Sequence, residues 1–485
     1  MAILSGYRPA HVVRFFEEIC GIPHPSGYEK ALCAYIRGYA ERYGHRCVED
    51  AAGNLIVYMD ASPGCEDAAP MLLQAHMDMV AAKAAGSQHD FLKDPIQLHI
   101  EEGHYLYANG TTLGADNAVG LVNMLALMVD DTVTHPPMEL LFTVGEESGM
   151  SGIRQVDFQL LRSRRMLNMD CGDPDVMCIS CAGSANCVVR LPLVRERAEG
   201  SGYVLEIKGL AGGHAGLMID SGRASAVVLM GRVLCALRRE VPFRLASAEC
   251  GGVQAIAAQA YARLAMSADM EERAQAVLER LLARLREEYG AAEPGLTVAL
   301  RRDAPVDTVM DEPSGARCAE LMYLLPYGVM QRDREDRSVI LNSVNTFRVT
   351  AHGGTAEYAL MVRSPVDALK WELVNRLDVL AGALGACLTV EDSVPGWPCR
   401  TDSPLQELCH RVYLRLTGRP LKTERVNSCA ETGVIAGAIP DMDIVALAPW
   451  GRGAHTPQEH LDLDSLQPFW EFLTALLRAM GHEQR

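Results

Sequence analysis

Basic residues are in deficit in this chain of 485 residues, where 45 Lys and Arg stand against 62 Asp and Glu, a formal charge of −17. Binding to nucleic acid or to an anionic membrane needs clustered Lys and Arg, so we expect neither partner. The chain has no run of about 18 apolar residues, which predicts no transmembrane helix. Its first residues also lack a basic segment followed by an apolar run and a cleavage site, so we expect a cytoplasmic protein.

A second Cys-x-x-Cys motif is missing as well. A structural zinc site would need two such pairs held on tight turns, whereas Cys178 and Cys181 lie in the largely apolar run VMCISCAGSANCVV. A zinc–thiolate or redox role for Cys171, Cys178, Cys181 and Cys187 is the alternative, and buried strand cysteines are the favoured interpretation. The 15 cysteines form an odd, scattered set, which is typical of reduced thiols in a cytosolic protein. No G-x-G-x-x-G follows the first strand, which argues against dinucleotide binding.

Short apolar runs dominate the N-terminal third of the chain. A capping box formed by Ser26 and Glu29 is predicted to precede a helix. The runs that follow are too short for helices and are separated by loops or by the helical stretch Ala118–Met128. This alternation predicts an α/β fold with a mostly parallel sheet and helices on both faces. The predicted strands are Asn54–Met59, Met71–Ala75, Glu139–Val144 and Met166–Met169.

The pattern changes after about Val188. More openly alternating strands and long amphipathic helices such as Met270–Glu288 predict an α+β domain. The turn-rich segment VPGWPCRTDSP, residues 394–404, marks its end, and a helix near Leu405–Thr417 and the strand Asp443–Ala448 restore the first pattern. We therefore predict a catalytic domain made of residues 1–187 and 394–485, with an inserted domain at 188–393. The clearest strands of the insertion are Tyr203–Lys208, Ser338–Val349 and Glu357–Val362.

Acidic residues and histidines follow the predicted strands of the outer domain. Ligands bind outside the carboxyl ends of strands in open parallel sheets, so these side chains should meet in one crevice. Two His and several carboxylates suit divalent metals, zinc first, and two ions could share a bridging carboxylate. Each residue alone would more often be a turn, capping or solvated residue. The set comprises His76, Asp78, Asp116, Glu146, Glu147, Asp170 and His455.

Together these segments resemble a known family, the PepD-type Xaa-His dipeptidases (aminoacyl-histidine dipeptidases). That family belongs to the co-catalytic zinc aminopeptidases, carboxypeptidases and aminoacylases. The resemblance implies a zinc-exopeptidase-like fold, in which the insertion is a lid and dimerisation domain, and a homodimer. The similar stretches, in order along the chain, are IPHPSGYEK, GNLIVY, LLQAHMDMV, HDFLKDPI, GTTLGADN, TVGEESGMSG, MLNMDCGD, GLAGGHAG, SGRASA and GAHTPQE.

The resemblance also implies a role for each residue. Two divalent ions per subunit, zinc or alternatively Mn²⁺ or Co²⁺, would activate a water that attacks a dipeptide. Glu146 would be the general base, and Asp78 would orient His76 through its second ring nitrogen. His76 and Asp170 would hold one ion, Glu147 and His455 the other, and Asp116 would bridge them.

Four further residues are expected at the substrate. By resemblance, His214 would stabilise the oxyanion, in its own subunit's site or across the dimer. Arg363 would pair with the substrate's carboxylate, Glu431 would contact its amino group, and Asn345 matches a substrate-contacting position. For His214 and Arg363 the alternatives are an exposed His in a Gly-rich turn and a solvated strand end.

Departures from the family pattern concern substrate recognition and leave the ligand set intact. They lie at Gly145, at Cys171 and Gly172, at residues 254–257 (Gln254 to Ala257) and at Asn427. Two other interpretations stay open beside the dipeptidase. One is an aminoacylase or carboxypeptidase acting on N-acyl amino acids, and the other is an inactive binding homologue.

Overall fold

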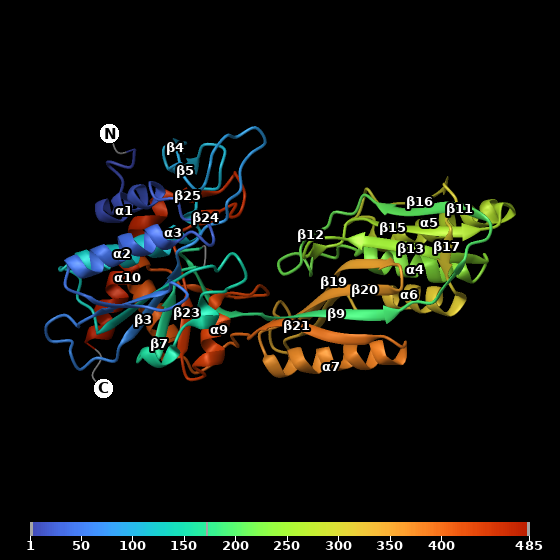
Figure 1. The fold of residues 1–485 in the computed structure, drawn as a ribbon. Coiled ribbons are helices and arrows are strands. Elements are labelled where there is room, and N and C mark those ends of the chain that lie inside the picture. The colour runs from blue at the N-terminus through green and yellow to red at the C-terminus, as the bar shows by residue number, and fades with distance from the viewer. Residues whose placement is uncertain (1–2, 171–172, 483–485) are drawn as a thin grey trace. The chain divides into compact units, whose positions relative to one another are not determined.

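The protein, represented by a computed structural model, is described for residues 3–170 and 173–482. The chain forms two compact units (Figure 1). The first comprises Met1–Ser180, Pro398–Arg425 and Ala430–Arg485, and the second comprises Cys181–Trp397 and Val426–Cys429. The range predicted for the insertion, 188–393, falls inside the second unit, and its role as a lid and dimerisation domain stays a prediction. Among the described helices, none has the length and apolar character needed to span a membrane.

An eight-stranded sheet organises the first unit, in the order β1-β2-β6-β3-β7-β23-β8-β22. The central strands β6, β3, β7 and β23 run parallel, whereas β1, β2 and β8 join antiparallel to their neighbours. Buried parallel strands read as continuous apolar runs, which is why the sequence reveals them. The strands are β1 (Arg46–Glu49), β2 (Leu55–Met59), β3 (Met71–His76), β6 (Met138–Thr143), β7 (Arg165–Asn168), β8 (Val176–Cys181), β22 (Lys422–Val426) and β23 (Asp443–Ala446).

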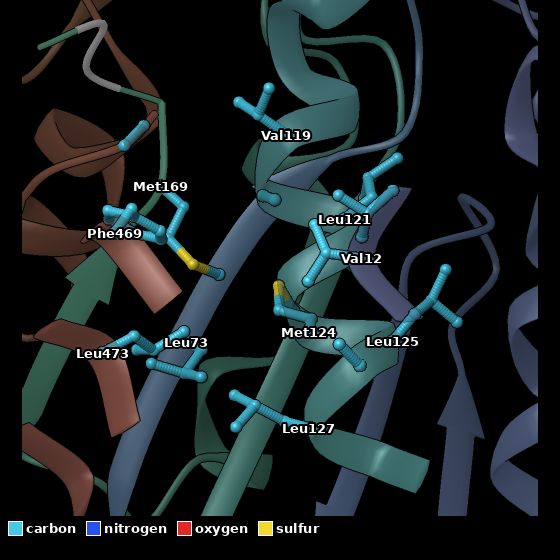
Figure 2. Packing of buried hydrophobic residues seen from close by; sticks show 14 of the residues in the cluster. Val12, Leu73, Val119, Leu121, Met124, Leu125, Leu127, Met169, Phe469 and Leu473 are labelled. Carbon is cyan, nitrogen blue, oxygen red and sulfur yellow. The ribbon is translucent and has the colours of Figure 1, made fainter. Parts of the chain in front are cut away.

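Helix α3 (Ala115–Val129) packs against β3 at the centre of this unit, and its residues are buried except for Asp116 and Val129. Apart from Asp116, Asn117 and Asn123, its residues are apolar on every side, as expected of a helix that lies in a core. Figure 2 shows its side chains in one cluster with Val12, Leu73 and Leu473, which come from α1, β3 and α10. The other helices of the unit are α1 (Ala10–Cys20), α2 (Lys30–Arg42), α8 (Pro404–Thr417), α9 (Glu431–Ala438) and α10 (Leu466–Gly481).

Helices cover both faces of the sheet. Successive strand residues point to opposite faces, so Gln74 lies on the face away from Leu73 and its core. There Gln74 donates a hydrogen bond to Glu431, the first residue of α9. The predicted α/β fold with helices on both faces is therefore confirmed, with a sheet whose parallel part is its centre.

A small antiparallel sheet stands apart from the large one, in the order β24-β25-β5-β4. It pairs β24 (Gly451–Arg452) with β25 (His460–Asp462), and β25 in turn pairs with β5 (Tyr105–Ala108), which pairs with β4 (Leu98–Glu101). The loop between β24 and β25 carries His455, so both ends of that loop are fixed by strand pairing.

The second unit is built on a nine-stranded antiparallel sheet, in the order β16-β11-β15-β13-β19-β20-β9-β21 with β18 beside β19. Four helices pack with it around a separate core: α4 (Ala226–Arg238), α5 (Glu271–Tyr289), α6 (Glu312–Leu324) and α7 (Asp367–Ala383). Two small strand pairs complete the unit, β10 (Arg195–Arg197) with β17 (Thr308–Met310) and β12 (Gly213–His214) with β14 (Ala255–Ile256). The large-sheet strands are β9 (Gly183–Pro192), β11 (Ser201–Lys208), β13 (Phe243–Gly251), β15 (Ala260–Met266), β16 (Thr297–Asp303), β18 (Gly328–Arg332), β19 (Ile340–His352), β20 (Thr355–Ser364) and β21 (Cys387–Val394).

Candidate active site

Predicted ligand residues follow the four parallel strands at the centre of the first unit. Because β6, β3, β7 and β23 are parallel neighbours, their carboxyl ends lie at one edge of the sheet. The buried start of α3 contributes one more carboxylate. The residues and their origins are His76 at the end of β3, Glu146 and Glu147 after β6, Asp170 after β7, Asp116 in the first turn of α3, and His455 in the loop after β24.

Asp116 is approached by two histidines, one at each carboxylate oxygen. Nε2 of His76 lies 3.0 Å from Oδ1 of Asp116 and 3.5 Å from Oδ1 of Asp170. Nε2 of His455 lies 3.4 Å from Oδ2 of Asp116 and 2.8 Å from Oε1 of Glu147. His76, Asp116 and Glu147 each offer an atom within 4.8 Å of the others, which makes them a candidate metal site.

Opposed charges dominate the electrostatics of this cluster. Burial alone would lower the pKa of His76, but Asp170 and Asp116 outweigh it and raise that pKa well above its ordinary value. Hydrogen bonds to Asp116 and Glu147 raise the pKa of His455 to about 10. Burial opposes the ionised form of Asp116, yet its contacts with the two imidazoles lower its pKa. Both histidines thus sit where positive charge is strongly favoured.

Several carboxyl groups around the cluster also have raised pKa values, which in their case favours the neutral form. Burial raises the pKa values of Asp170, Glu431 and Glu459 to about 7 each, and nearby carboxylates add to the effect. Burial likewise raises the pKa of Glu146 well above its usual range, with further contributions from Asp170 and Glu431. Like charges crowded away from water call for a compensating cation.

Asp78 connects the first histidine with the adjacent glutamates. Nδ1 of His76 lies 2.9 Å from the backbone carbonyl oxygen of Asp78 and 3.4 Å from its carboxylate. The carbonyl therefore accepts the Nδ1 proton, which leaves Nε2 to face Asp116. The carboxylate accepts the backbone N–H groups of Glu146 (2.9 Å) and Glu147 (3.2 Å). Asp78 thus contacts both sides of the cluster, through different groups.

The predicted capping box is wrong. α2 begins at Lys30, its N-cap Glu29 makes no capping hydrogen bond, and Ser26 lies outside the helix. Ser26 instead donates its hydroxyl to Asp78 (2.7 Å), and Glu29 accepts the N–H groups of Gly27 (2.8 Å) and Gly145 (3.1 Å). Ser26 thus has a distant partner in place of the predicted local one, and Glu29 joins Gly27 to the distant Gly145, which precedes Glu146.

Glu431 lies in a buried polar network on the α9 face of the sheet. Its Oε2 accepts hydrogen bonds from Gln74 and from Thr143 (2.7 Å), and only 1% of the residue is exposed. Gln74 in turn accepts a hydrogen bond from Asn168, whose Oδ1 accepts the N–H of Asp170 (3.2 Å). The network therefore links Glu431 to a predicted ligand.

His214 lies in the second unit, on the short strand β12. Its Nδ1 accepts the backbone N–H groups of Gly216 (3.2 Å) and Leu217 (3.1 Å). Because a backbone N–H can only donate, Nδ1 carries no proton and the neutral ring is protonated on Nε2. The exposed imidazole is thus fixed in the tautomer that donates through Nε2.

Asn345 and Arg363 share one face of the large sheet in the second unit. Arg363 pairs with Ser343 across β19 and β20, and Asn345 is two residues along β19, on the same side. Arg363 donates to Sγ of Cys429 (3.3 Å), and Asn345 donates to the carbonyl of Ala255 (3.0 Å). Oδ1 of Asn345 and Nε of Arg363 are buried without a hydrogen-bond partner among the described residues.

Comparisons with known proteins identify the relatives of this chain. A model of the peptidase family M20/M25/M40 matches residues 72–479. The chain belongs to this peptidase family. It is 32% identical over 481 residues to the cytosol non-specific dipeptidase of Escherichia coli (strain K12), with 99% of each chain covered. As a member of the M20 family, the chain is a hydrolase.

Solved structures agree with this family assignment. The aminoacylhistidine dipeptidase from Vibrio alginolyticus matches with a TM-score of 0.89 and 30% identity, covering 98% of both chains. The aminopeptidase PepT from Bacillus cereus matches with a TM-score of 0.57 and 15% identity over 98% of this chain and 99% of its own. The second match shows a shared fold alone.

Some departures of this M20 chain have a structural explanation. Gly145 has a φ of 62°, and a Cβ there would lie 2.3 Å from Oγ of Ser151, so an acidic side chain does not fit as the loop stands. Asn427 donates to the carbonyl of Gly216 (3.2 Å) and to Oγ of Ser343 (3.1 Å), which ties it to the His214 loop.

The structure explains none of the remaining departures from the family pattern. Cys171 and Gly172 lie outside the described residues. Residues 254–257 surround β14, which pairs His214 with Ala255, and the structure does not explain Gln254 or Ala257. Cys178, Cys181 and Cys187 are buried in β8 and β9, and the metal-competent group found among the described residues of this peptidase contains no cysteine.

Sequence reasoning missed Glu459. This residue follows His455 by four positions in the GAHTPQE stretch, and its carboxylate accepts backbone N–H groups from Leu113, Gly114 and Asp116. A glutamate in a turn is usually solvated, so nothing in the sequence marks this one as buried. The only available signal is its position in the same motif as a predicted ligand.

Proposed function

We propose that this M20 chain is a dipeptidase that works with two divalent cations per subunit, zinc first, with Mn²⁺ or Co²⁺ as alternatives. The observation that carries the proposal is the approach of His76 and His455 to separate oxygens of Asp116. A carboxylate reached from both sides by imidazole nitrogens has the arrangement of a bridging ligand. The names of the similar proteins, a cytosol non-specific dipeptidase and an aminoacylhistidine dipeptidase, support the substrate class and a cytoplasmic location.

The spacing of the donor atoms fits this cofactor. Ligand atoms about 2.0–2.2 Å from a tetrahedral zinc ion lie roughly 3.3–3.6 Å from one another. The nitrogen–oxygen distances of 3.5 Å at His76 and 3.4 Å at His455 match that value, and the other two, 3.0 and 2.8 Å, are shorter. His76 and Asp170 would hold one ion, Glu147 and His455 the other, and Asp116 would contact both.

The cations and the side chains would have different tasks in the reaction. When bound, the cations supply Lewis acidity that acidifies water and polarises the peptide carbonyl. Glu146 is proposed as the general base, because burial raises its pKa and therefore favours its holding a proton taken from water. Asp78 keeps the N–H of Glu146 and Nδ1 of His76 in place, which fixes the base relative to a ligand.

Substrate recognition is proposed for both units. Arg363 would pair with the dipeptide's terminal carboxylate and Asn345 would offer its unpartnered Oδ1, both from one face of the second sheet. Glu431 would attract the free amino group, and its buried Oε1 has no hydrogen-bond partner among the described residues. His214 would donate Nε2–H to the oxyanion, a role that its tautomer supports. A homodimer remains a prediction from the family resemblance.

A substrate panel tests the function. The protein is stripped with a chelator, reloaded separately with Zn²⁺, Mn²⁺ or Co²⁺, and offered Xaa-His, β-alanyl and other unblocked dipeptides beside their N-acetylated counterparts. We expect stripping to abolish hydrolysis, reloading to restore it, and unblocked dipeptides to be cleaved at least tenfold faster. Faster cleavage of the N-acyl compounds would identify an aminoacylase or carboxypeptidase instead. Metal binding without any amide hydrolysis would indicate an inactive binding homologue.

A further inference from the structure

Glu459 joins two loops of the metal site through one buried carboxylate. It lies between β24 and β25, and only 3% of the residue is exposed. Its Oε2 accepts the backbone N–H groups of Leu113 (2.8 Å) and Gly114 (2.9 Å), and its Oε1 accepts that of Asp116 (3.1 Å). All three donors belong to the start of α3.

The start of α3 needs such an acceptor. The first N–H groups of a helix have no partner within the helix and are usually satisfied by a local side chain or by water. Asp116 and Asn117, within the first turn of α3, have non-helical φ and ψ angles, and Oδ1 of Asn117 caps the regular helix by accepting the N–H of Gly120 (3.1 Å). The N–H groups of Leu113, Gly114 and Asp116 therefore lie in an irregular segment that precedes this cap, where residues 111–115 are buried and Gly114 has no side chain to offer. Glu459 supplies the missing acceptor from the far end of the sequence, so these buried backbone donors are satisfied.

The same contact bears on the metal ligands. Asp116 is both a donor to Glu459 and the carboxylate that the two histidines approach. His455, one of those histidines, lies four residues before Glu459 in the same loop. A single side chain therefore fixes the backbone of the bridging carboxylate relative to the loop of another ligand.

We propose that Glu459 is a positioning residue of the metal centre, which holds the start of α3 so that Asp116 can meet both histidines. The inference rests on the proposed function, because it assigns the carboxylate a task only if cations bind there. In this inference Glu459 contributes to the cation site without being a ligand of the cations. Loss of its contacts should weaken cation binding before it weakens the fold.

The variant E459Q tests this with little change in size. One amide oxygen can still accept, but the amide NH₂ then faces a backbone N–H, so either the Asp116 contact or the pair from Leu113 and Gly114 is lost. E459D keeps the charge but is one methylene shorter, and it replaces E459Q if that variant does not fold.

A matched control is available in the same unit. Glu139 in β6 is 4% exposed, and its carboxylate accepts the N–H groups of Arg162 (2.9 and 3.1 Å) and Ser163 (3.0 Å). It is equally buried and bound to backbone donors, but it contacts no predicted ligand. E139Q therefore measures what the loss of such a carboxylate costs the fold alone.

Three measurements are made on each full-length variant. Zn²⁺ affinity is obtained by competition with a chromophoric chelator, the unfolding free energy of the metal-free protein by urea titration, and amide hydrogen exchange over residues 113–116 by mass spectrometry. We expect E459Q to bind the weaker of two Zn²⁺ ions at least tenfold less tightly and to exchange faster at 113–116. E139Q should lose stability while its Zn²⁺ affinity stays within twofold of wild type.

Each other outcome has a definite meaning. If E459Q and E139Q both bind the two ions as tightly as the wild-type protein does, the positioning role is overturned and the proposed function is not. Equal loss of affinity in E139Q and E459Q also overturns it, because affinity would then follow general stability. Failure of the wild-type protein to bind Zn²⁺ or Mn²⁺ overturns the proposed function and this inference with it.

Discussion

Each unit places one buried glutamate against a segment that carries a predicted functional residue, but the two glutamates hold different things. Glu459 in the first unit accepts N–H groups at the start of one helix, next to Asp116. Glu293 in the second unit, 1% exposed, accepts the N–H of Ala211 (2.6 Å) and that of Ala224 (2.8 Å). These two donors bracket the segment that contains His214.

This difference shows how strongly each functional group is fixed. In the first unit the carboxylate acts on the backbone of the ligand itself, inside a buried core. In the second unit it fixes the ends of a segment, and the orientation of His214 depends on nearby bonds to Gly216 and Leu217. We therefore expect changes in the first unit to affect cation binding and changes in the second to affect turnover.

The largest effect is expected from E146Q in the first unit. Glutamine keeps the shape of the side chain but cannot accept a proton, and general-base catalysis contributes about 10²–10⁴-fold. Steady-state kinetics should show a fall in kcat of that size, while metal analysis still finds two ions per subunit. Retained activity would remove Glu146 from the base role, and loss of an ion would make it a ligand.

H214A tests the second unit in the same way. If Nε2 donates to the oxyanion, its removal should lower kcat by about 10²–10³-fold with little change in KM, because the contact strengthens in the transition state. H352A, which removes another exposed histidine of this unit, is the control and should behave as wild type. A change confined to KM would show that His214 only binds substrate.

Much of the first unit could be predicted because its strands are marked by short stretches of the sequence itself. Buried parallel strands produce short apolar runs, and the predicted runs match β2, β3, β6 and β7 to within one or two residues at each end. The polar residues that follow them then fall at one edge of the sheet. His76 and Asp170 came from this reasoning, and the 3.5 Å approach of Nε2 of His76 to the carboxylate of Asp170 follows from the parallel pairing of β3 with β7.

What could not be predicted depends on partners far away in the sequence. Ser26 and Glu29 look like a local helix cap but bind Asp78 and the N–H of Gly145 instead. The burial of Glu459 likewise depends on where the loop after β24 lands against α3. Spacing alone does not reveal such pairs, because local and distant acceptors compete for the same donors.

E293Q addresses the comparison between the two glutamates directly. An amide at this position leaves one N–H, of Ala211 or Ala224, facing another donor, so one end of the His214 segment is released. We expect kcat to fall about tenfold, equivalent to roughly 1.4 kcal/mol, while Zn²⁺ affinity stays at the wild-type value. Weakened Zn²⁺ binding in E293Q would mean that the two glutamates do not have separate tasks.

N427A should have the smallest effect on kcat. The control is S343A, which removes one of the two hydrogen bonds that N427A removes. Asn427 donates to the carbonyl of Gly216 and to Oγ of Ser343, and each hydrogen bond contributes about 0.5–1.5 kcal/mol net. S343A removes only the second bond, so it should leave kcat nearly unchanged, whereas N427A also releases Gly216, whose N–H orients His214. We expect N427A to lower kcat about fivefold at constant Zn²⁺ affinity, on the basis of one such bond. An equal loss in both variants would place the effect at the sheet face that carries Arg363, and not at the histidine.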